Sequence, residues 1–296
     1  MPPPTFLAFG DVMLDILVDT VSAPEPHAAR IRVLPGGSAA NAAVWAAACG
    51  ADAIAAGRVG SDAAAAMLRR ALETRGVGSR LAADASSYTG SVLVLGDGRA
   101  RRVLADRGAN ARLAEGDLPA EIEPDVLLVS GYVLLQADTG EAAGAVLAAS
   151  RAEWRAVDTA SAALLENYGV ERFLAVTEPA NAVVVGAAEA RLLTGCGRAR
   201  EAAATLGERY RLVGVKLGPE GAVAALDGDV RAARSESVET VDETGAGDAF
   251  TAAFLVAVAR GESLDGALSL AARCGALAAA SLGSWPRSQN LAELTD

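Results

Sequence analysis

The chain has 296 residues, of which 52% are hydrophobic and 21% are charged, and its formal net charge is −11 at pH 7. That length and apolar content suit one large α/β domain or two smaller ones. The acidic charge argues against non-specific binding to nucleic acid, which needs a basic face, although local dipoles can hold an anionic small molecule on an acidic protein.

The N-terminal sequence is not typical of a signal peptide, because no basic residues precede its apolar run and Asp11 and Asp15 interrupt it. No segment reaches the length of a membrane span. The cysteines, Cys49, Cys196 and Cys274, are far apart and lack Cys-x-x-Cys spacing, which favours reduced core thiols over a metal site or a nucleophile. We expect a cytoplasmic protein with no membrane partner.

Short apolar runs alternate with helical patterns along most of the chain. The apolar runs predict buried strands at 5–10, 52–60, 125–131, 155–160, 182–186 and 211–218. The helical patterns predict helices at 38–49, 62–75, 137–152, 187–195, 198–209, 247–260 and 263–281. Alternating β and α units imply a mainly parallel sheet with helices on both faces.

Two segments break this alternation. Residues 16–35 hold two short alternating runs around a Pro-rich turn, and residues 88–106 hold two strands joined by Gly-Asp-Gly-Arg, a hairpin signal. Both are typical of β-structure inserted into an α/β frame, and together they can form a small sheet. Since the chain has no internal repeat and no low-complexity linker, a cover on one main domain fits better than two independent domains.

The stretch VDETGAGDAF at 241–250 places a carboxylate directly behind a glycine-rich loop. Gly245, Ala246 and Gly247 can present backbone N–H groups at the start of a helix, an arrangement that binds anions. Asp248 follows in the first helical turn, where an acid also occurs simply as a helix-start residue. A phosphoryl-transfer site needs both groups, because N–H donors serve the phosphoryl oxygens and a carboxylate takes the proton of the attacking hydroxyl.

This stretch resembles the C-terminal motif of the ribokinase-like (PfkB) carbohydrate kinase family. Residues 35–62 resemble that family's N-terminal motif, with a Gly-Gly pair, an Asn and a closing Gly-x-Asp. The glycine loop is neither a Walker A loop nor a Rossmann fingerprint. The sequences FGDVMLD at 9–15, RGAN at 107–110 and VKLGPEGA at 215–222 extend the resemblance over essentially the whole chain.

The resemblance implies that Asp248 is the general base, which takes the proton from a primary hydroxyl of the acceptor. It also implies that the Gly-Ala-Gly loop is the anion hole for the γ-phosphoryl group of ATP. Four residues are implied to hydrogen-bond the hydroxyls of the sugar: Asp15, Gly36, Gly37 and Asn41. Each has an ordinary alternative, since Asp15 can be a strand-end acid, Asn41 a helix cap and the glycine pair a plain turn.

The nucleotide loop of the family is matched by Lys216, Gly218 and Gly221, although this single lysine of the chain can also be an exposed strand end. Asp242 and Thr244 match positions that help bind a monovalent cation, such as K⁺, in many relatives. Helix capping by Thr244 is the alternative interpretation of that pair.

Departures from the family pattern concern the cofactors and the acceptor. Gly186 replaces the Asn of the family's Asn-x-x-Glu motif, whereas Glu189, implied to hold Mg²⁺ through water, is retained. Tyr132 and Ser38 stand where ribokinases carry a sugar-contacting glutamate and often a lysine, which weakens an assignment to ribose. Residues 278–286 differ from the usual Thr-Arg-x-Gly-Ala ending, so dependence on potassium stays open.

We therefore expect a single three-layer α/β ribokinase-like domain over 1–296, with a mainly parallel sheet and a small β-sheet lid from about 12–35 and 86–107. The expected activity is ATP-dependent phosphorylation of a hydroxymethyl group on a small sugar or sugar acid, with Mg²⁺ required. Arg107 can reach an anionic acceptor such as a sugar acid, or can be a solvated surface arginine. Because the edge strands of the lid need pairing, we expect a homodimer joined through it.

Two alternative functions stay open. A nucleoside kinase of the same fold would need an aromatic or apolar slot for the base, and aromatic residues make up only 4% of the chain. A non-catalytic ligand sensor would be marked by loss of Asp248 or of the glycine loop, and both are present.

Overall fold

The computed structural model describes residues 2–19, 29–96, 101–118, 122–289 and 291. Its largest element is a nine-stranded sheet. In spatial order the strands are β13 (Asp229–Ala233), β12 (Ala222–Leu226), β11 (Leu212–Lys216), β10 (Ala182–Gly186), β9 (Trp154–Asp158), β8 (Val126–Val129), β1 (Thr5–Phe9), β4 (Asp52–Gly60) and β5 (Gly78–Asp84). The strands from β11 to β5 are parallel, whereas β12 and β13 are antiparallel at one edge.

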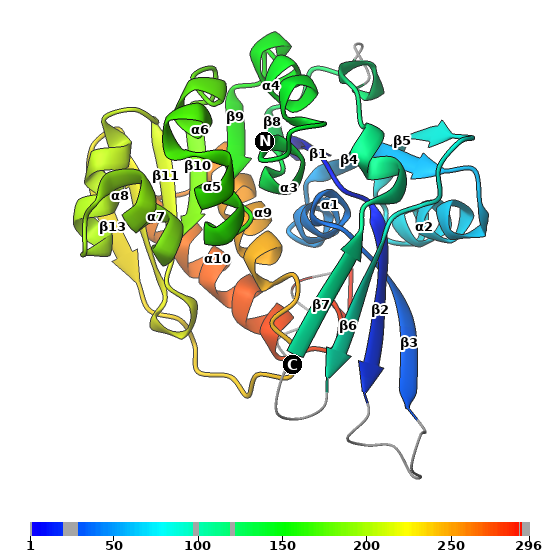
Figure 1. Ribbon diagram of the computed structural model, residues 1–296. Helices are drawn as coiled ribbons and strands as arrows, with labels where there is room; N and C mark the ends of the chain where they lie inside the picture. Colours follow the sequence, from blue (N-terminus) through cyan, green and yellow to red (C-terminus); the bar gives the residue numbers. More distant parts are fainter. Residues whose placement is uncertain (1, 20–28, 97–100, 119–121, 290, 292–296) are drawn as a thin grey trace.

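Helices cover both faces of this sheet (Figure 1). One face packs against α1 (Ser38–Ala48), α2 (Ala63–Thr74), α9 (Ala246–Ala259) and α10 (Leu264–Ala279). The other packs against α3 (Gly131–Leu134), α4 (Gly140–Ala149), α5 (Ala162–Tyr168), α6 (Val170–Val176), α7 (Ala187–Thr194) and α8 (Ala199–Gly207). Alternation along β1 produces the two layers, since Phe6 and Ala8 join the first core and Leu7 and Phe9 the second. The predicted α/β fold class is confirmed.

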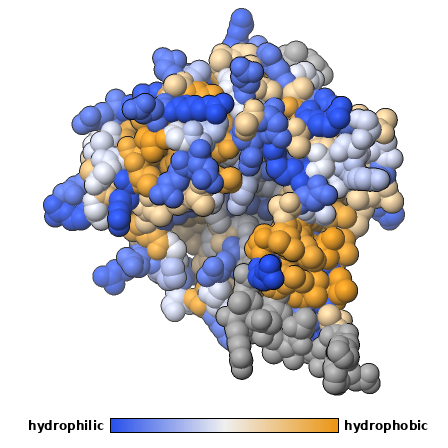
Figure 2. All heavy atoms as spheres, viewed as in Figure 1, coloured by the Kyte–Doolittle hydropathy of each residue, from blue (hydrophilic) through white to orange (hydrophobic). Residues whose placement is uncertain are grey.

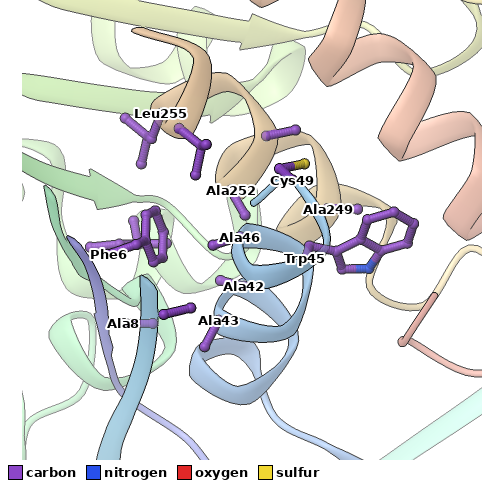
Figure 3. Packing of buried hydrophobic residues seen from close by; sticks show 14 of the residues in the cluster. Phe6, Ala8, Ala42, Ala43, Trp45, Ala46, Cys49, Ala249, Ala252 and Leu255 are labelled. Atoms are coloured by element: carbon purple, nitrogen blue, oxygen red, sulfur yellow. The ribbon is translucent and has the colours of Figure 1, made fainter. Parts of the chain in front are cut away.

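Alanine side chains bring α1 and α9 together over β1 (Figure 3). Ala42 and Ala46 of α1 and Ala249 and Ala252 of α9 are buried in one cluster with Phe6. Small side chains at a helix contact allow the helix axes to approach closely. These alanines therefore allow α1 and α9 to pack side by side.

A second, small sheet has the order β3-β2-β6-β7. Its strands are β3 (Arg30–Gly36), β2 (Met13–Asp19), β6 (Ser91–Gly96) and β7 (Arg101–Asp106). The pairs β2–β3 and β6–β7 are antiparallel, and β2 and β6 join them in parallel. The Pro-rich turn and the centre of the Gly-Asp-Gly-Arg turn, predicted from the sequence, lie outside the described residues.

Every predicted strand and helix of the large domain is present, although the helix predicted over 137–152 spans only Gly140–Ala149. The sequence analysis missed β5, the β12–β13 pair and the short helices α3, α5 and α6. The signal for β12–β13 was available, because Asp227 and Gly228 form their turn with positive φ angles of 49° and 86°. An Asp-Gly pair between apolar runs is a hairpin signal.

The remaining helical segments are single 3₁₀ turns: η1 (Gly108–Arg112), η2 (Glu115–Asp117) and η3 (Gly218–Glu220). No helix among the described residues is long and apolar enough to cross a membrane.

Candidate active site

A cavity of about 550 Å³ lies between the small sheet and the carboxyl ends of the parallel strands. Three lining residues stand at those ends, since Asp11 follows β1, Asp158 ends β9 and Lys216 ends β11. Aliphatic side chains of the small sheet line another wall: Val92, Val94, Val103 and Ala105. Open α/β sheets bind their ligands at this edge, so the cavity is the candidate active site.

Asp248 lies in the first turn of α9 and lines the cavity. Asn41 of α1 donates a hydrogen bond from Nδ2 to Asp248 Oδ2 at 2.8 Å. Burial raises the pKa of Asp248 to about 7, and the negative charge of Asp158 acts in the same direction. The Asn41 hydrogen bond and the positive charge of Lys216 oppose that rise in pKa. A carboxyl with a pKa near neutrality can take up a proton at physiological pH.

Trp285, which follows α10, orients the Asn41 amide. Its indole N–H donates to Asn41 Oδ1, with Nε1 and Oδ1 3.0 Å apart. Because an indole N–H can only donate, this contact makes the Asn41 oxygen an acceptor and leaves the amide N–H to point at Asp248. One oxygen of Asp248 is therefore tied to α1, and among the described residues no donor contacts the other. The sequence analysis did not identify Trp285 as a site residue.

Asp15 lies on β2, buried at the wall of the cavity, and Ser284 Oγ donates to its Oδ2 at 3.1 Å. A Cβ atom at Gly36 would lie 2.2 Å from that same oxygen. At Gly37, where φ is 93°, a Cβ would lie 2.5 Å from the carbonyl oxygen of Asp11. A side chain at either position would collide with Asp15 or Asp11, so this close packing requires both glycines. Their contact with sugar hydroxyls stays a prediction.

The glycine loop adopts the geometry of a helix start. Gly245 caps α9 with a left-handed φ of 79° and lines the cavity with Gly247. The N–H of Ala246 donates to the carbonyl oxygen of Glu243 at 3.2 Å, so the turn itself uses that donor. The N–H groups of Gly247 and Asp248 belong to the first helical turn, where no intrahelical acceptor exists. The positive end of the α9 dipole therefore faces the cavity.

Lys216 lies beside this helix start. Its Nζ is 3.5 Å from Thr251 Oγ1, and a Cβ atom at Gly247 would lie 3.3 Å from Nζ. The positive charge of Lys216 lowers the pKa values of Asp158 and Asp248 against the larger effect of burial. Its ammonium therefore belongs to the cavity, close to where the sequence predicts the transferred phosphoryl group.

Gly218 and Gly221, predicted to contact the nucleotide, lie in the connection between β11 and β12. Gly221 has a φ of 107°, and a Cβ there would lie 2.0 Å from the carbonyl oxygen of Ala233. The close approach of β13 therefore explains Gly221, whereas a Cβ at Gly218 would meet open space. The nucleotide contact of both glycines stays a prediction.

Arg107 lines the cavity with a side chain that is 20% exposed. Its Nη1 donates to both carboxylate oxygens of Asp138 at 2.7 and 2.9 Å, and its Nη2 donates to Thr139 Oγ1 at 3.0 Å. The guanidinium charge is therefore already paired with a carboxylate. Contact of Arg107 with an anionic acceptor stays a prediction.

Comparison with known proteins identifies the family. Residues 5–289 match the profile described as pfkB family carbohydrate kinase. The chain belongs to the pfkB family of carbohydrate kinases. It is 30% identical to a fructokinase of Escherichia coli over 292 residues, 93% of each chain. It is 32% identical to a 1-phosphofructokinase of Haloferax volcanii over 243 residues, 79% of this chain and 76% of that one.

Solved structures share the fold. The adenosine kinase of Sinorhizobium meliloti superposes with a TM-score of 0.86 at 19% identity, covering 97% of both chains. An Escherichia coli protein provisionally named ribokinase II, in complex with ATP and Mg²⁺, superposes with a TM-score of 0.85 at 22% identity, covering 98% of this chain and 97% of that one. Its family and its named relatives make this protein a kinase, a phosphotransferase with an alcohol acceptor, as the sequence predicted.

The carboxylates that the structure describes are not clustered into a metal-binding site. No group of three or more His, Cys, Asp or Glu side chains among the described residues can hold a metal ion. Glu189 lies in the first turn of α7, and a Cβ at Gly186 would lie 2.2 Å from its Oε2. The glycine that replaces the family's Asn therefore makes room for this carboxylate. One carboxylate suits a water-mediated contact with a Mg²⁺ ion that phosphates hold.

The Asp242–Thr244 turn organises the C-terminal segment. Asp242 Oδ1 accepts from the N–H of Thr244 at 3.0 Å and from its hydroxyl at 2.6 Å, and Oδ2 accepts from Gly283 N–H at 3.2 Å. The Thr244 side chain does not cap α9, so the capping alternative was wrong. Binding of K⁺ at this turn stays a prediction.

The two acceptor-side departures also lie near the cavity. Ser38 Oγ is hydrogen-bonded to Ser130 Oγ at 2.5 Å, and Ser38 lines the cavity. Tyr132 lines the cavity and is 43% exposed, and burial of its hydroxyl together with nearby carboxylates raises its pKa to about 12. Tyr132 therefore stays protonated and can donate a hydrogen bond.

Proposed function

We propose that this kinase transfers the γ-phosphoryl group of ATP to a hydroxymethyl group of a small sugar or sugar acid, with Asp248 as the general base. The observation that carries the proposal is the position of Asp248, which has a pKa of about 7 and lies in the first turn of α9 beside Lys216. A base works best when its pKa is near the working pH. A helix start and a cation stabilise the charge on a transferred phosphoryl group.

Each group of the site has a separate part in the proposed reaction. When bound, ATP supplies the phosphoryl group and Mg²⁺ offsets the charge of its phosphates. Asp248 accepts the hydroxyl proton while the hydroxyl oxygen bonds to phosphorus and the bond to the ADP oxygen breaks. The N–H groups of Gly247 and Asp248 and the ammonium of Lys216 face the phosphoryl oxygens. Asn41 holds the base in place through its hydrogen bond.

We further propose that the small sheet is a lid of a single domain, with segments at about 12–35 and 86–107. It carries Asp15, a proposed contact for acceptor hydroxyls, and the aliphatic wall of the cavity. Closing such a cover excludes water, which would otherwise compete with the acceptor for the phosphoryl group.

A nucleoside is the second candidate acceptor. The cavity has the apolar wall that a base would need, formed by Val92, Val94 and Val103, and the partly exposed ring of Tyr132 also lines it. Such a lining can hold a planar base, although Tyr132 is its one aromatic side chain among the described residues.

We propose that two copies pair through the outer face of the lid. Strand register places Ile31, Val33 and Leu104 on the face opposite Asp15. These three side chains are exposed, and Figure 2 shows apolar atoms gathered over the small sheet. Light scattering should give a dimer for the wild type and a monomer for the double variant Val33→Glu, Leu104→Glu. A monomeric wild type would refute this pairing.

An acceptor panel tests the reaction itself. Purified protein, ATP and Mg²⁺ are incubated with D-fructose, D-ribose, D-gluconate or adenosine, and ADP release is measured. Acceptor-dependent ADP release that is lost in the Asp248→Asn variant supports the proposal. Release with adenosine alone selects the nucleoside alternative, and no acceptor-dependent release with any of the four contradicts the kinase proposal.

A further inference from the structure

Asp11 is a buried carboxylate whose Oδ1 has no hydrogen-bond partner among the described residues. It follows β1, is 5% exposed and lines the cavity. Among the described residues only two buried side-chain polar atoms lack a partner, and they are Asp11 Oδ1 and Arg107 Nε. Both belong to residues that line the same cavity. A buried polar group without a partner costs free energy, so a pair of them at a ligand cavity indicates that a ligand completes them.

The backbone of Asp11 is held firmly, unlike its side chain. Its carbonyl oxygen accepts from the N–H of Ala39 in the first turn of α1 at 3.1 Å, and Gly37 packs against that oxygen. The next residue, Val12, donates its N–H to Asn110 Oδ1 at 3.1 Å. The main chain of Asp11 is therefore fixed at the wall of the cavity, while its Oδ1 has no donor among the described residues. Such preorganisation suits a binding group.

The charges around Asp11 decide which ligand can complete it. Burial raises the pKa of Asp11 to about 6, Asp138 and Asp158 add to the rise, and Arg107 opposes it. At neutral pH the group is mainly ionised and can only accept hydrogen bonds. The nearby cation, Arg107, is already paired with Asp138. An incoming anion would therefore meet an ionised carboxylate and a neutralised guanidinium.

We propose that Asp11 is a specificity-determining residue of the acceptor site, which accepts a hydrogen bond from a neutral hydroxyl of the acceptor and disfavours acceptors with a carboxylate or phosphate at that end. Arg107 lines the same cavity, and its Nε–H has no acceptor among the described residues. This inference rests on the proposed kinase function. It narrows the acceptor from a sugar or sugar acid to a neutral polyhydroxyl compound.

Matched acceptor pairs test this selection. D-Fructose and fructose 1-phosphate share a free hydroxymethyl group at C6, and D-ribose and ribose 1-phosphate share one at C5. The wild type should use the neutral member of at least one pair with a kcat/KM at least about tenfold higher. The Asp11→Asn variant should lose about 10- to 100-fold in kcat/KM with that neutral acceptor, mostly through KM, while the ratio between pair members narrows. The Kd for ATP, measured without acceptor, should not change.

A stability control separates binding from architecture. Asp84 is equally buried at 5% exposure, but it lies outside the cavity and accepts hydrogen bonds from Ser86 and Arg58. Asp84→Asn should lower the Tm, because it weakens existing bonds. Asp11→Asn should leave the Tm equal or higher, because it removes a buried charge that no described residue hydrogen-bonds. A fall in Tm for Asp11→Asn comparable to that for Asp84→Asn would show a structural role and overturn the inference.

The two proposals fail in different ways. If no acceptor produces ADP, the kinase proposal fails, and Asp11 is then judged by the thermal stabilisation that D-fructose or D-ribose gives to the wild type but not to Asp11→Asn. Stabilisation of both proteins alike, or of neither, overturns the inference. The inference is also overturned if the wild type prefers the phosphorylated member of both pairs. An unchanged kcat/KM in the Asp11→Asn variant overturns it as well.

Discussion

Two regions of this kinase hold buried carboxylates, and they shift the pKa values of these groups in opposite directions. Beneath the edge of the large sheet, Arg58 binds Asp117 through Nε and Nη2, both at 2.8 Å, and also contacts Asp84. Arg112 and Ser86 add donors to Asp84, and these hydrogen bonds hold its pKa down at about 2. In the cavity, Asp11 and Asp248 have pKa values raised to about 6 and 7.

The difference has two causes, since burial raises the pKa of Asp11 and hydrogen bonds from Ser86 lower that of Asp84. Asp84 and Asp11 are equally exposed at 5%, yet one has several donors and the other has none among the described residues. A carboxylate with donors stabilises the fold, whereas a carboxylate without them costs stability and is ready for a proton or a ligand. The paired cluster is therefore structural, and the cavity is the part of the molecule that bears a cost for function.

Among the variants, Asp248→Asn should have the largest effect on activity. Loss of the general base should lower kcat by about 10²–10⁴-fold, with sugar and ATP binding largely intact, because the base acts in the transition state. The Tm at pH 8 should not fall, since the variant removes a buried charge. Steady-state kinetics and thermal unfolding of the same preparation check both parts. Near wild-type turnover would refute the mechanism.

Gly247→Val adds a side chain at the proposed anion hole. Its Cβ would approach Lys216 Nζ at 3.3 Å and occupy the space of the phosphoryl group, so we expect a loss of about 10²–10³-fold in kcat. Folding should survive, because Gly247 lies within α9 and does not need a positive φ. Circular dichroism and ADP release separate the two effects. A folded variant with full activity would make this stretch only a helix start.

Activity and stability should depend on pH in opposite directions. Because Asp248 must be ionised to act, kcat/KM should rise about tenfold per pH unit below a pKa of about 7 and level off above it. The free energy of unfolding should instead fall as pH rises. A carboxyl with a raised pKa keeps its proton in the folded state, so its contribution to stability falls as pH rises from about 4 to 7. Unfolding of the wild type and of Asp248→Asn across that range should show a shallower slope for the variant.

Trp285→Phe should have a smaller effect on activity. It removes the donor that orients the Asn41 amide while keeping most of the packing, so we expect kcat to fall by about tenfold or less. The acid limb of the pH profile should move to higher pH, because Asn41 lowers the pKa of Asp248. An unchanged limb would mean that Asn41 keeps its orientation without the indole.

Arg58→Ala should lower stability and leave activity nearly unchanged. It should leave kcat/KM within about twofold of the wild type, since Arg58 does not line the cavity. The free energy of unfolding should fall by about 1–3 kcal/mol, because Asp117 loses both guanidinium donors. Chemical denaturation measures the loss. A large drop in activity with unchanged stability would reverse the assignment of the two regions.

The amino-acid sequence was enough to predict the alternation of buried strands and helices, the inserted β-segments and the glycine loop before Asp248. These features depend on local periodicity and on backbone requirements that neighbouring residues reveal. It also carried the family resemblance, which residues 5–289 confirm. It did not distinguish Asp11 from any other acid that follows a strand, because a missing partner leaves no trace in the residues nearby.

Which side chains contact one another depends on the packing of segments that lie far apart in the chain. Trp285 contacts Asn41 across 244 positions, and Asn41 contacts Asp248 across 207. The sequence predicted Arg107 as a candidate anion contact, and the fold pairs its guanidinium with Asp138. The pKa of a carboxyl depends on burial and on neighbouring charges, which packing of distant segments creates. The chemistry of this cavity is therefore set by contacts that no local pattern encodes.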